Sequence, residues 1–426
     1  MNKLVFRRLV VAAALIAAPL AFVSRASAEE TLSWIDCVRE AQKHHPDLIS
    51  AAEQVSQDES AKRIAASGEY PQVDASAGAS TSKSSGTPSQ KNYSAGVTGN
   101  QMVYDGKKTI NGVKAAGENI QAARQNFRFT SADVRSRLRV AFIGLLKSQE
   151  MMLIAKDIYE IRRGNLELIT LRYQSGLEHR GALMTAEASL ADARYGIAQA
   201  RRSHEVAQCQ LAKEMGREQW TALAAKGDFT VKDTAKGDLD LAALAQTNSQ
   251  VRKAIAQKNA AEFNLKADYG DFAPSVSVNG SAFQAGKDLP PGQSQVSAGL
   301  TVTLPIFEGG LRKAKVAQAQ ALVRQLEADE RSTRDSVQLT LEQDRSALID
   351  ALENVSVQQI ALLAAEERSR VAQAQYSIGT ITYDNWSIIE DNLVSAKRGY
   401  LNAQAVALLA EAEWARAKGE TLEYEE

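Results

Sequence analysis

Several common features are scarce in this sequence, and each scarcity excludes a class of protein. Lys and Arg number 50 against 51 Asp and Glu, so no excess of positive charge supports nucleic-acid binding as the main function. The two cysteines, Cys37 and Cys209, lie too far apart and are too few for a disulfide framework, and whether they pair is left open. No apolar run of 18 residues follows residue 28, so no transmembrane helix is expected there.

Proline and glycine are absent from long stretches. No proline lies between residues 88 and 274 or after 305, and residues 311–378, a run of 68, contain neither proline nor glycine. Helices in compact domains average about 11–12 residues, so this run predicts one very long helix of roughly 100 Å. Such a helix disfavours a compact α/β enzyme.

Catalytic and metal-binding signatures are also missing. The four histidines, His44, His45, His179 and His204, have no metal-ligand partners at helical spacing. Phosphate-loop, dinucleotide-binding and nucleophile-elbow motifs are absent. The sequence therefore predicts no enzyme, no cofactor and no metal site.

The N-terminal segment has the pattern of a secretory signal peptide. Residues 1–8 are positively charged, Leu9–Val23 form a short apolar core, and residues 26–28 read Ala-Ser-Ala, a typical cleavage motif. We expect residues 1–28 to be removed and the mature chain to begin at Glu29. An N-terminal anchor helix is the alternative. Because neither cysteine directly follows the cleavage site, a lipid anchor is not indicated.

The rest of the chain is predicted to be an internal duplication. Similar residues recur at a constant offset of 203 positions (274 − 71) over some 120 residues. The matching pairs are Pro71 and Pro274, Tyr104-Asp105-Gly106 and Phe307-Glu308-Gly309, Tyr173 and Tyr376, and Gly176 and Gly379. We predict a first repeat over 29–230, a second over 231–419 and an acidic tail over 420–426.

Each repeat is predicted to contain a helix, a β-hairpin, a long helix, a turn and a returning helix. The first repeat begins with one helix over 33–67. The hairpins are expected over 71–103 and 274–305, with their outer loops at 83–92 and 286–294, and the turns over 173–180 and 376–384. We expect residues 217–238 and 422–426 to form a belt around the helices.

The four predicted strands alternate strictly between apolar and polar residues. Val296, Ala298, Leu300 and Val302, for example, alternate with Ser, Gly and Thr. Strands of about ten residues with one apolar and one small polar face suit a membrane β-barrel with a wet lumen, although hairpins half-buried in a soluble domain remain an alternative. Four strands cannot close a barrel, and open edges are not tolerated in lipid, so several chains must contribute. Two chains would give eight strands and three would give twelve, enough for an open lumen.

The long helices show coiled-coil spacing. Apolar and small residues step by four and three along the long helix of each repeat, which favours left-handed packing against neighbouring helices. The positions are Val134, Leu138, Ala141, Leu145, Ser148, Met152, Ala155 and Tyr159 in the first repeat, and Val337, Leu341, Asp344, Leu348, Ala351, Val355, Gln358 and Leu362 in the second.

Taken together, the duplication, the hairpins between helices, the prolines at the strand entries and the Tyr-x-x-Gly turns resemble the TolC-like outer-membrane efflux protein family. The resemblance covers essentially the whole mature chain. It implies an α+β membrane protein: a homotrimer with a twelve-stranded transmembrane β-barrel, four strands per chain, continued by a long α-helical coiled-coil barrel in the periplasm. It further implies an outer-membrane export channel of a tripartite efflux or type I secretion system. A soluble periplasmic coiled-coil adaptor or scaffold is the alternative, and a periplasmic enzyme is disfavoured by the missing catalytic site. Its partners would be a periplasmic adaptor, an inner-membrane transporter and outer-membrane lipid, with no nucleic acid.

The resemblance places the functional residues at the turns. The periplasmic tip and adaptor-docking positions would be Tyr173, Gly176, Tyr376, Gly379, Tyr383 and Trp386. The family's two acidic gate positions fall on Asn385 and Ile388 here, so this chain departs from that pattern. The gate candidates are then Arg180, Asp384, Asn385, Glu390 and Asp391. Arg180 and Asp384 are a candidate ion pair across the closed tip, with solvated helix ends as the alternative. For Tyr383 and Trp386, packing inside the helix bundle is the alternative to adaptor docking.

Overall fold

The computed structural model describes residues 30–83, 85–86, 88–219, 221–231 and 240–423. The expected signal peptide, the end of the acidic tail and part of the expected belt segment lie outside these residues. In the first half the elements are β1 (Glu30–Ser33), α1 (Trp34–His44), α2 (Pro46–Ala66), the 3₁₀ turn η1 (Ser67–Glu69), β2 (Gln72–Ser82), β3 (Gln90–Tyr104), α3 (Lys108–Gln174), α4 (Arg180–Glu214) and β4 (Leu223–Lys226). In the second half they are α5 (Leu241–Thr247), α6 (Ser249–Gly270), β5 (Ser275–Gly286), β6 (Gln293–Thr303), α7 (Leu311–Ser377) and α8 (Tyr383–Lys418).

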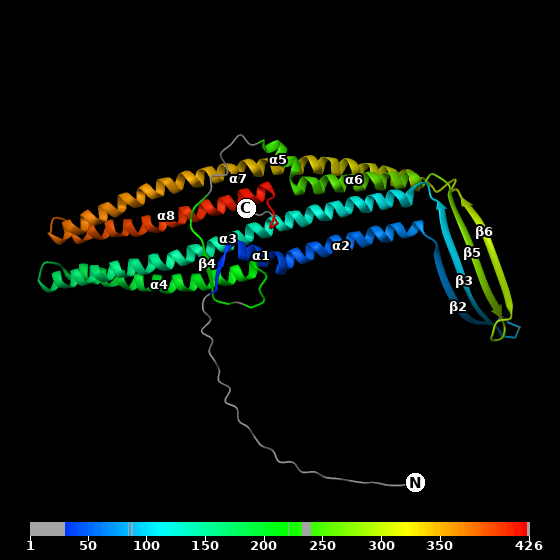
Figure 1. The fold of residues 1–426 in the computed structure, drawn as a ribbon, viewed down its shortest axis with the longest axis horizontal. Helices are drawn as coiled ribbons and strands as arrows, with labels where there is room; N and C mark the ends of the chain where they lie inside the picture. The colour runs from blue at the N-terminus through cyan, green and yellow to red at the C-terminus, as the bar shows by residue number, and fades with distance from the viewer. Residues whose placement is uncertain (1–29, 84, 87, 220, 232–239, 424–426) are drawn as a thin grey trace, which may run out of the picture.

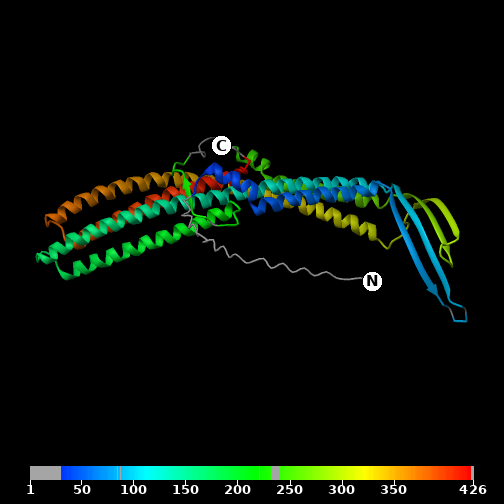
Figure 2. The ribbon, with the colours of Figure 1, turned by 60° about the horizontal axis from the view of Figure 1, so that its bottom comes forward.

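The molecule is strongly elongated, with a sheet at one end and two helical hairpins at the other (Figures 1 and 2). The helices α3 and α7 contain 67 residues each, which corresponds to about 100 Å. The long helix expected over 311–378 is therefore confirmed almost to the residue. Equivalent elements also begin 203 positions apart, since α3 starts at Lys108 and α7 at Leu311 (311 − 108).

The sheet is antiparallel with the strand order β2-β3-β5-β6. Its register places Ala75, Val97, Ala282 and Val296 side by side, so the apolar residues of all four strands share one face. The face is nevertheless open to solvent in the single chain, because no helix covers the sheet (Figure 1). The strands β2 and β6 each have only one neighbour among the described strands of this sheet.

The first helix differs from the expectation. We predicted one helix over 33–67, and the structure breaks it at His45 into α1 and α2. A residue that precedes proline is pushed out of the helical conformation, and His45 accordingly has φ −69° and ψ 122°. Its Nδ1 accepts a hydrogen bond from the backbone N–H of Asp47 at 3.2 Å, so the histidine caps α2. Asn248, 203 positions later (248 − 45), caps α6 in the same way.

In the middle of the molecule the first and last described segments of the chain pack against the long helices. Strand β1 pairs in parallel with β4, which puts Leu32 opposite Ala225. Strand β4 lies in the expected belt, but the sequence analysis did not predict either of these two strands. Cys37 is buried in the core below this belt, where burial raises the pKa of its thiol to about 12. Both Cys37 and Cys209 are free thiols, so the two are not bridged.

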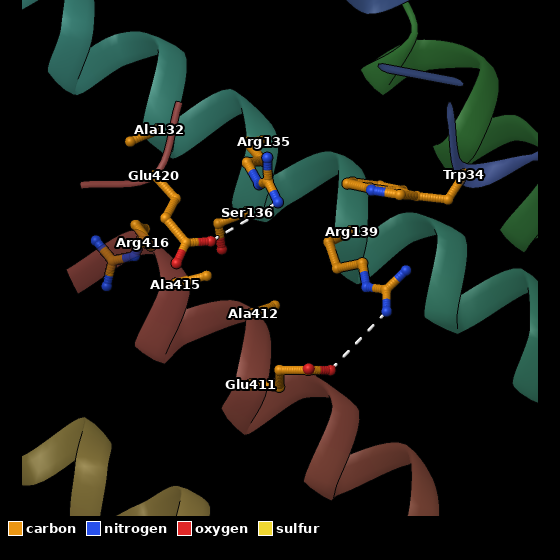
Figure 3. A pocket seen from close by; sticks show the side chains of 10 residues that line it. All are labelled: Trp34, Ala132, Arg135, Ser136, Arg139, Glu411, Ala412, Ala415, Arg416 and Glu420. Carbon is orange, nitrogen blue, oxygen red and sulfur yellow. Dashed lines mark ion pairs between the residues drawn. The ribbon is translucent and has the colours of Figure 1, made fainter. Parts of the chain in front are cut away.

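The end of α8 is held against α3 by ion pairs, which Figure 3 shows beside a small pocket. Arg135 Nη2 lies 3.7 Å from Glu420 Oε2, and Arg139 Nη2 lies 3.9 Å from Glu411 Oε2. The guanidinium of Arg139 also stacks over the ring of Trp34, 5.0 Å from its centre. Segments that begin and end the described chain are thereby joined at one level of the bundle.

Candidate gate at the helical tip

Both Tyr-x-x-Gly turns end a long helix with glycine in the left-handed conformation. Gly176 has φ 71° and Gly379 has φ 80°, where a side chain would strain the backbone. Each glycine donates its N–H to the carbonyl of the tyrosine three residues earlier, Tyr173 or Tyr376, at 3.0 Å. A second backbone hydrogen bond encloses each turn: the N–H of Leu177 donates to the carbonyl of Arg172 at 2.8 Å, and the N–H of Thr380 donates to that of Gln375 at 2.9 Å. The predicted glycine caps are confirmed.

The returning helices begin with side-chain caps. His179 Nδ1 accepts a hydrogen bond from the N–H of Ala182 at 3.1 Å and caps α4. Thr382 Oγ1 accepts one from the N–H of Asn385 at 3.4 Å and caps α8. Asn385 therefore belongs to the first turn of α8, and its own side chain is exposed.

A cluster of aromatic rings fills the space between the two hairpins at the tip. The ring of Tyr376 is stacked on that of Trp386, with centres 4.5 Å apart and planes 13° apart. Tyr383 meets both rings edge-on, at 6.3 Å from Tyr376 and 6.4 Å from Trp386. Both Tyr376 and Trp386 are only 1% exposed. Ile169 of α3, Ala182 and Ala186 of α4, and Ala372 of α7 complete the packing.

Charged groups of the first hairpin hold Tyr376 of the second. The guanidinium of Arg172 lies 4.7 Å from the centre of the Tyr376 ring, and its Nη1 donates to the Tyr376 carbonyl at 3.2 Å. The Tyr376 hydroxyl donates to Glu178 Oε2 at 2.8 Å. Burial and the Glu178 carboxylate hold the pKa of this hydroxyl well above its usual range, so it remains a donor at every physiological pH. We call Arg172, Glu178, Tyr376, Tyr383 and Trp386 the tip cluster.

Two further ion pairs join α3 to α8 away from the tip. Arg162 Nη2 lies 2.5 Å from Asp391 Oδ1, and Lys397 pairs with Asp157. One gate candidate, Asp391, is thus a contact between the two hairpins of a single chain. Another, Glu390, is buried between α7 and α8, where its carboxylate accepts a hydrogen bond from Ser369 Oγ at 2.5 Å.

The remaining candidates lie apart from one another. Arg180 and Asp384 are both exposed at the start of their helices, and no ion pair joins them within the described part of the single chain. Tyr383 and Trp386 are buried inside the helix bundle, so their position agrees with packing, which was the alternative to a role in adaptor docking. Tyr173 is 39% exposed, although its equivalent Tyr376 is buried.

Sequence patterns missed the residues that join the hairpins. Arg172 and Tyr376 are 204 positions apart, and Arg162 and Asp391 are 229 apart. No motif marks Arg172 or Arg162, because each is one of several arginines along the helix α3. The repeat offset also gives no hint, since the residues that meet are not equivalent positions in the two repeats.

Within the described residues, no helix is long and apolar enough to span a membrane. No group of three or more His, Cys, Asp or Glu side chains in that part of the chain is placed to hold a metal ion.

The fold defines an elongated chain with an open sheet that has one apolar face, two helices of about 100 Å, and a pair of glycine turns at the far end, an architecture suited to a channel protein. Known proteins support this class. The family model described as outer membrane efflux protein matches residues 37–217 and 241–420, and the chain belongs to this family.

Individual relatives support the same assignment. The outer membrane efflux protein BepC of Brucella suis is 24% identical over 376 residues, which covers 85% of this chain and 81% of BepC. The CmeC outer membrane channel of Campylobacter jejuni has the same fold, with a TM-score of 0.81, 17% identity and coverage of 91% of this chain and 85% of CmeC. The MtrE outer membrane channel of Neisseria gonorrhoeae, solved in its open state, has a TM-score of 0.80, 20% identity and coverage of 91% and 88%. The chain is therefore an outer-membrane efflux channel protein and not a soluble adaptor, and its family consists of channels rather than enzymes.

Proposed function

We propose that three copies of this chain form one export conduit across the outer membrane and the periplasm. Three four-stranded sheets would close a twelve-stranded β-barrel, and the duplicated helical hairpins would continue it as a tunnel. The conduit would receive substrates from an inner-membrane transporter through a periplasmic adaptor, in a tripartite efflux or type I secretion system.

The sheet with unpaired edges carries this proposal. Its apolar face is open to solvent, and the outer sides of β2 and β6 have no strand partner among the described residues. In lipid, every backbone N–H and C=O needs a partner, so β2 of one copy must pair with β6 of the next. Three sheets provide twelve strands, which leave an open lumen lined by the small polar face.

The helices support the same assembly. Large apolar residues along α7 are exposed in the single chain and spaced at helical intervals: Leu339, Val357, Ile360 and Leu363. Surface stripes of this kind on a helix are usually covered by another helix. The neighbouring copy is the partner that a closed trimer supplies.

The tip is proposed as the gate and the adaptor-docking end. The tip cluster holds the two hairpins of one chain together, while the turns around Gly176 and Gly379 present exposed apolar residues, Leu177 and Ile378. Docking at these turns would favour separation of the hairpins and widening of the tunnel entrance.

Assembly and conduction can be tested together on the purified full-length protein. We expect a trimer mass in detergent by native mass spectrometry, recovery in the outer-membrane fraction, and discrete single-channel currents in planar bilayers. A cysteine in β2 (Ala77→Cys) combined with a scan of single cysteines along β6 should give cross-links between chains at one register only. A monomer without channel currents would refute the proposal.

A further inference from the structure

The exposed aromatic side chains gather at the junction of sheet and helices. Seven aromatic residues are exposed in the described chain, and five of them flank the helix-side ends of the strands: Tyr70, Tyr104, Tyr269, Phe272 and Phe307. Aromatic rings at this position are typical of the level where a membrane β-barrel passes from hydrocarbon to water. The junction therefore marks the inner boundary of the membrane.

The apolar surface extends slightly beyond the last strand. The register puts Tyr104, Val276 and Val302 in one row on the apolar face. After β6, the side chains of Ile306 and Phe307 are 94% and 88% exposed. The lipid-facing surface thus reaches the first residues of the helical part.

Positive charges follow this surface directly. Three of the nearby cations already have carboxylate partners within the chain, since Lys108 and Lys315 share Asp271 and Arg312 pairs with Glu308. Lys107 and Lys313 are different. Both are exposed, and neither has an ion-pair partner among the residues that the structure describes.

Lys107 is also held in an unusual backbone conformation. Its φ is 70°, and no other residue apart from glycine has a positive φ in the described ranges. The equivalent position in the second repeat is Gly310, with φ 89°, where the left-handed conformation carries no strain. A lysine at this position costs backbone energy that glycine avoids, which is expected where the side chain itself has a use.

We propose that Lys107 and Lys313 bind the headgroups of anionic phospholipids in the leaflet that faces the helices. The inference rests on the proposed function, because it takes the sheet as the membrane-spanning part. An ammonium group directly beyond an aromatic band lies at the depth of the lipid phosphates, and two unpaired ammonium groups favour anionic over zwitterionic headgroups. In a trimer the two lysines form a ring of six charges around the conduit.

The test measures lipid retained by the purified full-length trimer. The protein is equilibrated in detergent with equal amounts of phosphatidylglycerol and phosphatidylethanolamine, and bound lipid is counted by native mass spectrometry. We expect the wild type to retain phosphatidylglycerol preferentially. The variants Lys107→Gly and Lys313→Gln should each lower this preference roughly fivefold.

Two controls separate charge from fold. The pair Lys43→Gln and Lys156→Gln removes the same charge from exposed helical positions, and Lys156 lies about 70 Å along α3 from the junction. It should keep the preference. Lys107→Gly relieves backbone strain, so its melting temperature should equal or exceed that of the wild type even as lipid preference falls.

An unchanged preference in Lys107→Gly and Lys313→Gln, or an equal loss in the control pair, would overturn the inference. A wild-type trimer that inserts and conducts without any preference would overturn this inference alone. A protein that neither inserts into vesicles nor conducts would overturn the membrane assignment and the inference together.

Discussion

The hydroxyl of Tyr376 offers a single-atom perturbation of the proposed gate. Tyr376→Phe removes the hydrogen bond to Glu178 but leaves the ring stacked on Trp386 and under the guanidinium of Arg172. The Glu178 side chain is largely buried, so the loss leaves a carboxylate with one donor fewer and little water to replace it. The variant should therefore destabilise the contact between the two hairpins specifically.

The size of the effect follows from the chemistry of the bond. A hydrogen bond to a charged group contributes about 1.5–3 kcal/mol, and about 1.4 kcal/mol corresponds to a factor of ten in an equilibrium constant. Loss of the bond should shift the balance between joined and separated hairpins by roughly 10- to 100-fold in each chain. In the proposed trimer three chains surround one entrance, so a concerted opening would combine three such shifts.

Single-channel recording in planar bilayers measures this shift as longer or wider openings. Tyr173→Phe is the matched control, since Tyr173 holds the equivalent position in the first repeat and is partly exposed to water. We expect Tyr376→Phe to increase mean conductance and Tyr173→Phe to leave it unchanged. Equal currents in the two variants would show that the bond to Glu178 does not hold the tip.

Three other predictions concern the gate and the stability of the fold. Trp386→Ala should cost about 3–5 kcal/mol, because a buried indole is replaced by a cavity, and should lower the melting temperature of the protein. An unchanged melting temperature would show that the neighbouring side chains at the tip move to fill the space. The double variant Arg180→Ala, Asp384→Ala removes both charges and should raise single-channel conductance. An unchanged conductance in this variant would exclude the pair from the gate. The Arg137 guanidinium donates to Asp47 at 2.5 Å and holds the pKa of that carboxyl below its usual value. The bond stabilises the fold above about pH 4 and is lost as pH falls through the folded pKa of Asp47. In Asp47→Asn the melting temperature should therefore depend less on pH below about pH 4 than it does in the wild type.

Local patterns were sufficient for the elements whose cause is local. The absence of proline and glycine predicted α7, and the alternation of Val296 to Val302 predicted both the strand and its apolar face. The break at His45 was open to prediction as well, because Pro46 is a common first residue of a helix and marks its start. The parallel pairing of β1 with β4 was not, since strands of four residues carry almost no periodicity.

Equivalent residues with different surroundings show where sequence reasoning ends. Tyr173 and Tyr376 belong to the same motif and end their helices with the same hydrogen bonds. Only Tyr376 is buried, because Trp386 lies against its ring and Glu178 of the other hairpin accepts its hydroxyl. The motif specifies the turn, which depends on backbone conformation, but it does not specify the neighbours of the side chain.

The sequence by itself determined the length of α7, the two-faced strands and the glycine turns, since each of these depends on residues close together in the chain. It also contains the 203-residue recurrence, which a comparison of its two halves reveals without any structure. The tertiary structure alone decided which residues join the hairpins, as with Arg172 and Tyr376 or Arg162 and Asp391. These contacts depend on how α3 lies against α8 and on how the two hairpins meet at the tip, and a shift of one helical turn would pair other residues. Packing of the whole bundle selects the pairs, so no local pattern contains them.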